Sequence, residues 1–195
     1  QVIQVDGKLT ENVWGSAKWY PIDQLLVGVL SSAEDFQGQY ALAWKEHRLY
    51  LAAKIVDDRL MDQIPDPKKR YWDDDCLEIF IDEVKSGGDH QENHNAFAYH
   101  LALDNQVADI DSDGKARLYN DHALNSWKNY QDYLIWEVEL TIYDDSYQDS
   151  FTDSSDTNTP VVLAANKDMG FMLAYCDNDN SDERESFIGS HPIAG

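Results

Sequence analysis

Basic residues are scarce in this chain, which has 15 Lys and Arg against 37 Asp and Glu and a formal net charge of -22 over 195 residues. Phosphate backbones and anionic membrane surfaces repel a protein of this charge, which argues against nucleic acid as a partner and against membrane insertion. A neutral ligand or a cation remains compatible with it. The charge also has a simpler explanation, which is solubility in a salty exterior.

The chain also has no long apolar run and few cysteines. The longest apolar run, Leu25–Leu30, is far too short to span a bilayer. Only two cysteines occur, Cys76 and Cys176, and their number does not fix the redox compartment. No signal peptide is visible and the first residue is Gln1 rather than Met, so we interpret the chain as a processed or excised piece of a longer polypeptide.

The chain does contain alternation of apolar and polar residues with a period of two, which is typical of strands with one face in a core. The alternation recurs over residues 39–44, 49–56, 76–82, 97–104, 134–142 and 171–176. Aromatic residues, which favour strands, make up 12% of the chain. The predicted fold class is all-β: an antiparallel two-sheet β-sandwich, jelly-roll or immunoglobulin-like, with roughly ten strands. We expect one domain over residues 1–195.

Signals for helices are weak. Thr10–Trp19 predicts one short helical turn with Thr10 as its cap and Trp14 facing inward. Ser86–Asn95 and Asp144–Pro160 are rich in polar and turn-forming residues and are predicted to be loops.

The segment Tyr71–Asp82 is the first candidate for function, because Trp72 precedes a strand whose outward face carries Glu78. An indole ring stacks on the apolar face of a sugar, and a carboxylate accepts hydrogen bonds from sugar hydroxyls. The alternative is a core tryptophan followed by a solvated acidic turn, and spacing alone does not choose between the two.

Three longer segments carry recognisable sequence motifs, and they follow one another along the chain: Val5–Trp14, Leu49–Asp58 and Trp72–Asp82. A further pattern is Gly170–Tyr175, followed by Asp177 and Arg184. Together these segments resemble the family 9 carbohydrate-binding modules over nearly the whole chain. The resemblance implies a non-catalytic β-sandwich that binds oligo- or polysaccharides. It also implies a larger secreted, periplasmic or cell-surface protein, such as a glycan-degrading enzyme, whose other domains would be its partners.

By this resemblance, Trp72 matches one wall of an aromatic sugar clamp, Glu78 a hydroxyl-binding carboxylate and Arg184 a polar residue near the pocket. His100 and Cys176 stand where members of the family carry amides. These five residues are the predicted ligand-binding set.

The chain also departs from the family pattern. Ala98 stands where the family carries a basic side chain. Near the position of a second clamp tryptophan the chain reads Ser190-His191-Pro192, and it stops at Gly195 before the closing strand of the family. We therefore expect this chain to lack its final strand, a stretch with room for a second aromatic residue.

Two metal-binding patterns compete with simpler interpretations. Asp109–Gly114 copies the start of a calcium loop, but Arg117 and Asn120 fill its ninth and twelfth positions, and Asp-Gly is a strong hairpin signal, so a hairpin turn is favoured. His90 and His94 have the spacing of a transition-metal site on a helix. They lie in a predicted loop, which favours a solvated turn.

Calcium is better supported by the density of loop carboxylates, which would repel one another without a cation. The ligands predicted for a structural calcium ion are Asp57, Asp58, Asp73 and Asp74, and the alternative set is Asp177, Asp179 and Asp182.

Catalysis is not predicted. Glu78, Glu137 and Glu139 all fall on outward strand faces, and opposed carboxylates would suit glycoside hydrolysis. The chain nevertheless has no serine nucleophile elbow and no glycine-rich phosphate loop, and its motifs resemble a binding family. Two other functions stay open: a haem- or redox-binding sandwich that uses His100 and Met172, and a structural or adhesive module without affinity for small ligands.

The two cysteines belong to the same outward face as Glu78 by strand parity. A disulfide requires Cα atoms within roughly 7 Å. Because Cys76 lies near a strand start and Cys176 near a strand end, free thiols are favoured over a bridge.

Overall fold

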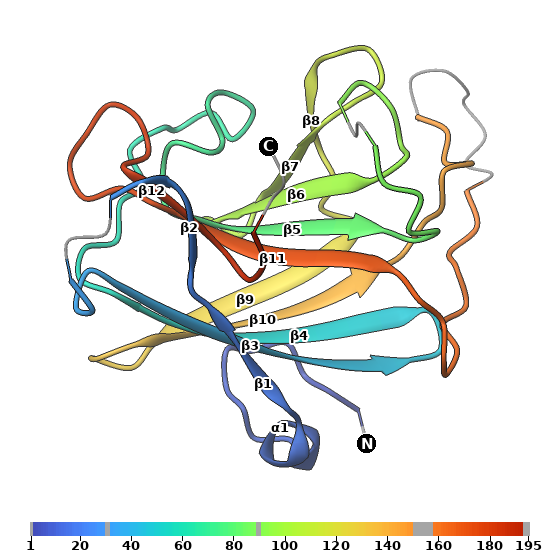
Figure 1. The fold of residues 1–195 in the computed structure, drawn as a ribbon, viewed down its shortest axis with the longest axis horizontal. Helices are drawn as coiled ribbons and strands as arrows, with labels where there is room; N and C mark the ends of the chain where they lie inside the picture. Colours follow the sequence, from blue (N-terminus) through green and yellow to red (C-terminus); the bar gives the residue numbers. More distant parts are fainter. Residues whose placement is uncertain (1, 30–31, 89–90, 150–157, 193–195) are drawn as a thin grey trace.

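In the computed structural model, the chain forms two β-sheets stacked face to face, with one short helix outside them (Figure 1). The structure describes residues 2–29, 32–88, 91–149 and 158–192. The elements in this part of the chain are α1 (Asn12–Ser16), β1 (Trp19–Ile22), β2 (Gln24–Gly28), β3 (Phe36–Lys45), β4 (Arg48–Asp57), β5 (Cys76–Asp82), β6 (Phe97–Ala102), β7 (Val107–Ile110), β8 (Ala116–Leu118), β9 (Ala123–Asn129), β10 (Leu134–Thr141), β11 (Gly170–Asp177) and β12 (Ser186–Gly189).

All neighbouring strands are antiparallel. Sheet A, the five-stranded sheet, has the order β1-β3-β4-β10-β9, and sheet B, the seven-stranded sheet, has the order β2-β12-β11-β5-β6-β7-β8. The predicted two-sheet sandwich is therefore confirmed. The twelve strands exceed the predicted number because short strands such as β8, with three residues, contain too few residues to show alternation.

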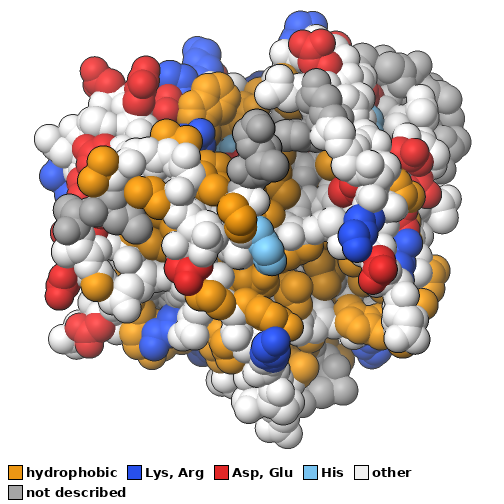
Figure 2. Space-filling view, in the orientation of Figure 1, with side chains coloured by type: hydrophobic (Ala, Val, Ile, Leu, Met, Phe, Trp, Pro, Cys, Tyr) orange, Lys and Arg blue, Asp and Glu red, His pale blue; other side chains and the backbone are white. Residues whose placement is uncertain are grey.

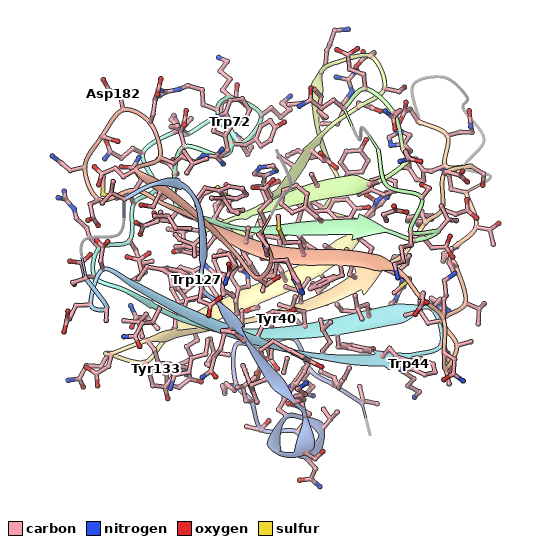
Figure 3. All side chains as sticks on the ribbon, viewed as in Figure 1. Tyr40, Trp44, Trp72, Trp127, Tyr133 and Asp182 are labelled. Carbon is pink, nitrogen blue, oxygen red and sulfur yellow. The ribbon has the colours of Figure 1, made fainter. Side chains whose placement is uncertain are left out.

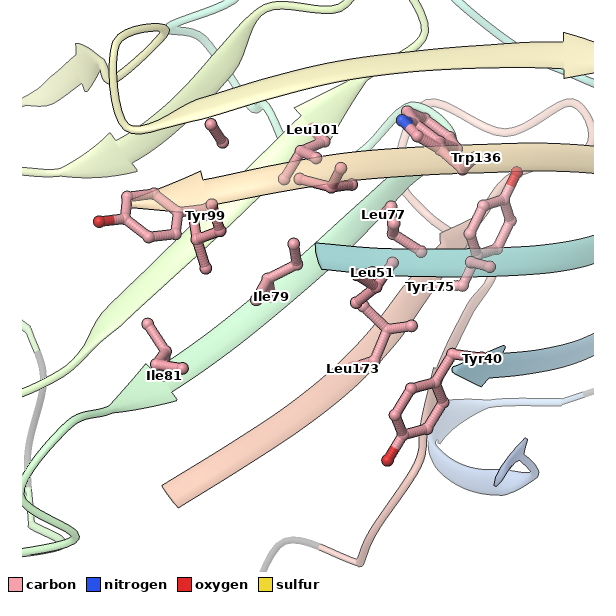
Figure 4. Packing of buried hydrophobic residues seen from close by; sticks show 14 of the residues in the cluster. Tyr40, Leu51, Leu77, Ile79, Ile81, Tyr99, Leu101, Trp136, Leu173 and Tyr175 are labelled. Carbon is pink, nitrogen blue, oxygen red and sulfur yellow. The ribbon is translucent and has the colours of Figure 1, made fainter. Parts of the chain in front are cut away.

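The core fills the space between the two sheets, as the alternation predicts. Leu77, Ile79 and Ile81 of β5 and Leu173 and Tyr175 of β11 are each at most 3% exposed. Figure 4 shows these side chains meeting those of sheet A between the two layers. Burial of each aliphatic side chain stabilises the fold by about 1.5–3 kcal/mol.

The outer face of sheet A is covered by the N-terminal segment. Glu137 on β10 is fully buried there and accepts a hydrogen bond of 3.0 Å from Trp14 Nε1. The backbone N–H groups of Asp6 and Lys8 donate to its other oxygen, each at 3.1 Å. Glu137, which strand parity places outward, therefore anchors the N-terminal segment.

Helix α1 is shorter than predicted and has a different cap. It begins at Asn12, and its N-cap is Glu11 rather than Thr10. The Thr10 N–H instead donates to the Lys8 carbonyl in a tight turn, which places Thr10 before the helix. Trp14 faces inward as predicted and is 3% exposed.

The predicted loops 86–95 and 144–160 contain no strand in their described residues, while 89–90 and 150–157 lie outside the described part. In the view of Figure 2, acidic side chains are scattered around the outline and hydrophobic ones gather across the middle. A search of the described residues finds no helix of sufficient length and apolarity to cross a membrane.

Candidate ligand-binding site

A groove of about 410 Å³ lies on the outer face of sheet B, over β5 and β6. This volume falls within the range of about 300–1,000 Å³ that is typical of small-molecule sites. The groove is lined by Tyr71, Trp72, Glu78, Phe80, Gln91, Ala98, His100, Asp109, Ile110, Arg184 and Phe187. Figure 3 shows Trp72 on the β4–β5 loop above sheet B, close to the β11–β12 loop that carries Asp182.

Strand register places two of the predicted residues side by side at the floor of the groove. Glu78 on β5 is directly opposite His100 on β6, so both side chains point to the same face. Glu78 Oε1 lies 3.1 Å from His100 Nε2, and His100 Nδ1 lies 2.8 Å from the Ala98 carbonyl oxygen. Because both ring nitrogens face acceptors, the geometry favours the doubly protonated, charged imidazole.

The ion pair also explains the pKa of His100. Burial alone would lower this pKa, but the charge of Glu78 and the hydrogen bond to it outweigh burial and raise the pKa to about 9. Because the folded pKa exceeds the unfolded value, the pair stabilises the fold fully below about pH 6.5, and this contribution is lost as the pH rises through about 9.

Glu78→Gln is expected to bring the pKa of His100 down from about 9 to below its ordinary value of 6.5. The variant removes the negative charge but leaves the burial, which favours the neutral ring. NMR titration of the imidazole signals measures the change, and the signals of His47, in the β3–β4 turn, provide the internal reference. A pKa of His100 that stays near 9 in the variant would contradict this assignment.

Cys176 lies beneath the groove rather than in its wall, and it connects two of the other predicted residues. Arg184 Nη1 donates to Cys176 Sγ at 3.3 Å, and Cys176 Sγ lies 3.8 Å from Glu78 Oε2 as a donor. The Arg184 guanidinium also lies 4.4 Å from the centre of the Phe187 ring, a cation–π contact. The structure thus connects Arg184, Cys176, Glu78 and His100 by consecutive contacts.

Trp72 lies at the mouth of the groove and is 39% exposed, so it is not a core tryptophan. Its ring meets Tyr71 edge-on at 4.8 Å, and Tyr71 meets the His100 ring at 4.7 Å. Burial, together with the charges of Asp109 and Glu78, raises the pKa of Tyr71 to about 12, so its phenol is neutral at ordinary pH. Tyr71 therefore supports Trp72 above the ion pair.

Sequence reasoning missed three aromatic residues of this groove: Tyr71, Phe80 and Phe187. Phe80 could have been predicted from the sequence, because strand parity puts it on the same face as Glu78. Phe187 belongs to β12, whose four residues show no alternation because all of them are buried.

The two cysteines are buried and free, and they lie directly opposite each other on β5 and β11. The predicted free thiols agree with the structure, although the two cysteines are not kept apart by their places at a strand start and a strand end. In an antiparallel pair, the start of one strand lies beside the end of its neighbour.

The structure does not gather the four aspartates predicted for calcium around one point. Asp57 lies with Asp75 and Asp177, whereas Asp58 lies with Asp35 and Asp179. Asp57 and Asp58 belong to different clusters because the side chains of consecutive residues at a strand end point in different directions.

The other two predicted aspartates have different partners. Asp73 Oδ1 accepts from the Arg184 N–H at 3.3 Å, and Asp74 Oδ2 accepts from the N–H groups of Gln63 and Ile64 at 2.9 and 2.7 Å. The acidic segment before β5 is not the solvated turn of the alternative interpretation, since Asp73 in it is only 4% exposed.

The cluster of Asp57, Asp75 and Asp177 has the stronger electrostatics. Burial first, and then the charge of Asp57, raises the pKa of Asp75 to about 9 and that of Asp177 to about 8. In the neighbouring cluster, the buried Oδ1 of Asp179 has no hydrogen-bond partner in the described part of the chain. Both donor sets consist of oxygen alone, which suits calcium.

The Asp109–Gly114 segment forms the predicted hairpin turn between β7 and β8. The Asp111 N–H donates to the Lys115 carbonyl at 2.9 Å, and Gly114 has a φ of 75°. His94, by contrast, does not lie in a solvated turn, because it is only 8% exposed. His90 lies outside the described residues.

The two alternative chemistries fit the site poorly. Glu137 and Glu139 lie on the outer face of sheet A and Glu78 on the outer face of sheet B, so the thickness of the sandwich separates Glu78 from the other two carboxylates. As a haem ligand, His100 would have to give up a contact with Glu78 or Ala98, and Met172 is buried in an apolar cluster on the outer face of sheet B.

Three comparisons place the chain among known proteins. The family model described as carbohydrate family 9 binding domain-like matches residues 5–195. A search of curated protein sequences finds no match.

The similar solved structures include two complexes of a family 9 carbohydrate-binding module from Caldicellulosiruptor kristjanssonii. The complex with glucose has a TM-score of 0.62 and 16% identity, covering 97% of this chain and 82% of the other. The complex with cellotriose has a TM-score of 0.60 and 16% identity, covering 97% and 80%. A putative carbohydrate-binding protein from Bacteroides uniformis has a TM-score of 0.59 and 11% identity, covering 92% and 79%. At these identities the likeness shows the shared fold.

Proposed function

The chain belongs to the carbohydrate family 9 binding domain-like family, and from this premise we propose that it binds carbohydrate, without catalysis, in the groove on sheet B. The observation that supports this proposal is the position of the exposed Trp72 beside the buried Glu78–His100 pair. A sugar ring offers an apolar face for stacking and hydroxyl groups for hydrogen bonds, and the groove supplies a partner for each.

Each residue has a distinct role in this proposal. Trp72 stacks on the sugar and Glu78 accepts a hydroxyl hydrogen. His100 lines the floor of the groove and orients Glu78, because its two ring nitrogens already meet Glu78 and the Ala98 carbonyl. Arg184 supplies donors, and Cys176 holds Arg184 against Glu78 rather than contacting the sugar. The opposite charges of Glu78 and His100 balance, so a neutral ligand meets no net charge at the floor of the groove.

We also propose that calcium stabilises the domain at the two carboxylate clusters, whose residues lie at or next to the ends of strands of both sheets. The cluster of Asp57, Asp75 and Asp177 and the cluster of Asp35, Asp58 and Asp179 would hold the ion through oxygen atoms. The orphaned buried oxygen of Asp179 and the mutual repulsion of these aspartates support a cation there.

The family match supports a proposal about the cellular setting. We propose that the domain acts in a larger protein that is secreted, periplasmic or on the cell surface, where it holds a glycan-degrading enzyme or another partner domain close to polysaccharide.

A glycan array in calcium-containing buffer, followed by calorimetry on each hit, tests the proposal. Glucose and cellotriose are the first ligands to try, because they are the ligands in the two similar complexes. Binding that maps to the groove would support the proposal. An array without any hit would instead favour a structural or adhesive module, and an ultraviolet-visible spectrum of the purified protein would detect haem directly.

A further inference from the structure

Three segments that are far apart in the sequence bring His94, Asp111 and Asp149 together at one point. His94 lies in the β5–β6 loop, Asp111 in the β7–β8 turn and Asp149 in the segment after β10. One ligand atom from each residue lies within 4.8 Å of the others. The residues are 8%, 4% and 5% exposed, so this is a buried cluster and not a solvated acidic surface.

The three side chains are oriented so that one atom of each is directed inward. His94 Nε2 contacts Asp149 Oδ1 and lies 3.6 Å from Asp111 Oδ1. The opposite oxygens face outward to other groups: Asp149 Oδ2 accepts from Ser112 Oγ, and Asp111 Oδ2 lies 3.5 Å from Arg117 Nε. Supporting contacts of this kind orient the ligands at metal sites in proteins.

The ring of His94 is also fixed by packing. It stacks on Phe97 at 5.1 Å with an angle of 19° between the planes, and it meets the edge of Tyr147 at 4.9 Å. These contacts restrict rotation of the imidazole and keep Nε2 directed at the two carboxylates.

A second observation points to a missing ligand. The Tyr119 hydroxyl is buried and has no hydrogen-bond partner among the residues that the structure describes. Tyr119 is 5% exposed, packs against Phe97 and Tyr147, and lies within electrostatic reach of Asp111 and Asp149. A buried hydroxyl normally has a partner, and a metal-bound water beside these carboxylates would provide one.

We propose that His94 Nε2, Asp111 Oδ1 and Asp149 Oδ1 bind a divalent transition-metal ion, with Zn²⁺ as the best match. Zinc takes nitrogen and oxygen ligands in four-coordinate sites, often with three protein ligands and one water, which here would accept the Tyr119 hydrogen bond. Calcium prefers oxygen ligands alone, so the imidazole separates this site from the two carboxylate clusters. The ion would tie three loops together at one end of the sandwich.

Calorimetry with zinc chloride tests this site on chelator-treated protein in calcium-containing buffer, so that the carboxylate clusters are supplied with their own cation. Wild-type protein should bind one equivalent. His94→Ala and Asp149→Asn should each weaken binding by about a hundredfold, since the first removes a ligand and the second removes the negative charge of one. His47→Ala, which alters a histidine in the β3–β4 turn, is the matched control and should bind as wild type does.

Two measurements on the wild-type protein do not depend on the folding of any variant. Cobalt(II) in place of zinc should give the visible absorption of a four-coordinate site, and saturating zinc should raise the melting temperature by roughly 5 °C. The proposal is overturned if wild-type protein binds no zinc, if calcium displaces it at equal concentration, or if both variants bind it undiminished. Sugar affinity plays no part in these readouts, so they stand apart from the proposed function.

Discussion

Trp72→Ala is expected to weaken carbohydrate binding at least about thirtyfold, or about 2 kcal/mol, as loss of an aromatic anchor typically does. The melting temperature should change little, because the indole is 39% exposed and lies outside the core between the sheets. Calorimetry on any sugar that binds the wild-type protein measures the effect. Trp72→Phe should retain part of the affinity, since a smaller ring still stacks.

Trp44→Ala is the matched control for this experiment. Trp44 is 50% exposed on β3 of sheet A, and Figure 3 shows it at the opposite corner of the sandwich from Trp72. Its loss removes a similar exposed indole but should leave sugar affinity unchanged. Unchanged affinity in Trp72→Ala would remove Trp72 from the site, and a large fall in its melting temperature would assign it a structural role.

Alternation along the sequence was sufficient to predict the layers of this fold, because burial of one strand face depends on local pattern. It placed Leu77 and Leu173 in the core and Glu78 and His100 on an outer face, as the structure has them. That Glu78 and His100 form an ion pair depends on the register of β5 against β6, which local pattern does not determine.

The acidic residues show more strongly that local sequence does not determine which distant residues meet in the fold. Asp57 and Asp58 are adjacent in sequence but belong to different clusters, and each meets aspartates from distant segments. Asp75 and Asp35 were not among the predicted ligands, because nothing in their local sequence distinguishes them from the other acidic residues. The proposed zinc site was missed for the same reason. Three separate segments form it, and the local sequence around His94 favoured a solvated turn.

Calcium is expected to raise the melting temperature of chelator-treated protein by roughly 5 °C or more at about pH 8. Without a cation, the fold brings Asp57, Asp75 and Asp177 together in a buried cluster, where their charges repel one another. Thermal unfolding with calcium and with chelator, at constant ionic strength, measures the difference. Asp177→Asn should reduce the calcium effect, and magnesium at the same concentration, which binds such sites with a stricter geometry, is the control.

The dependence on pH separates a bound ion from a general salt effect. Burial and the charge of Asp57 raise the folded pKa of Asp75 to about 9 and that of Asp177 to about 8, well above the ordinary value of 3.8. A raised carboxyl pKa favours folding fully below the unfolded pKa, and that contribution is lost as the pH rises through about 8 to 9. Chelator-treated protein should therefore lose stability progressively from about pH 4 to about pH 9, while calcium, which binds the ionised carboxylates, should increasingly compensate. Equal melting temperatures with calcium and chelator at the alkaline end would rule out a structural ion at these aspartates.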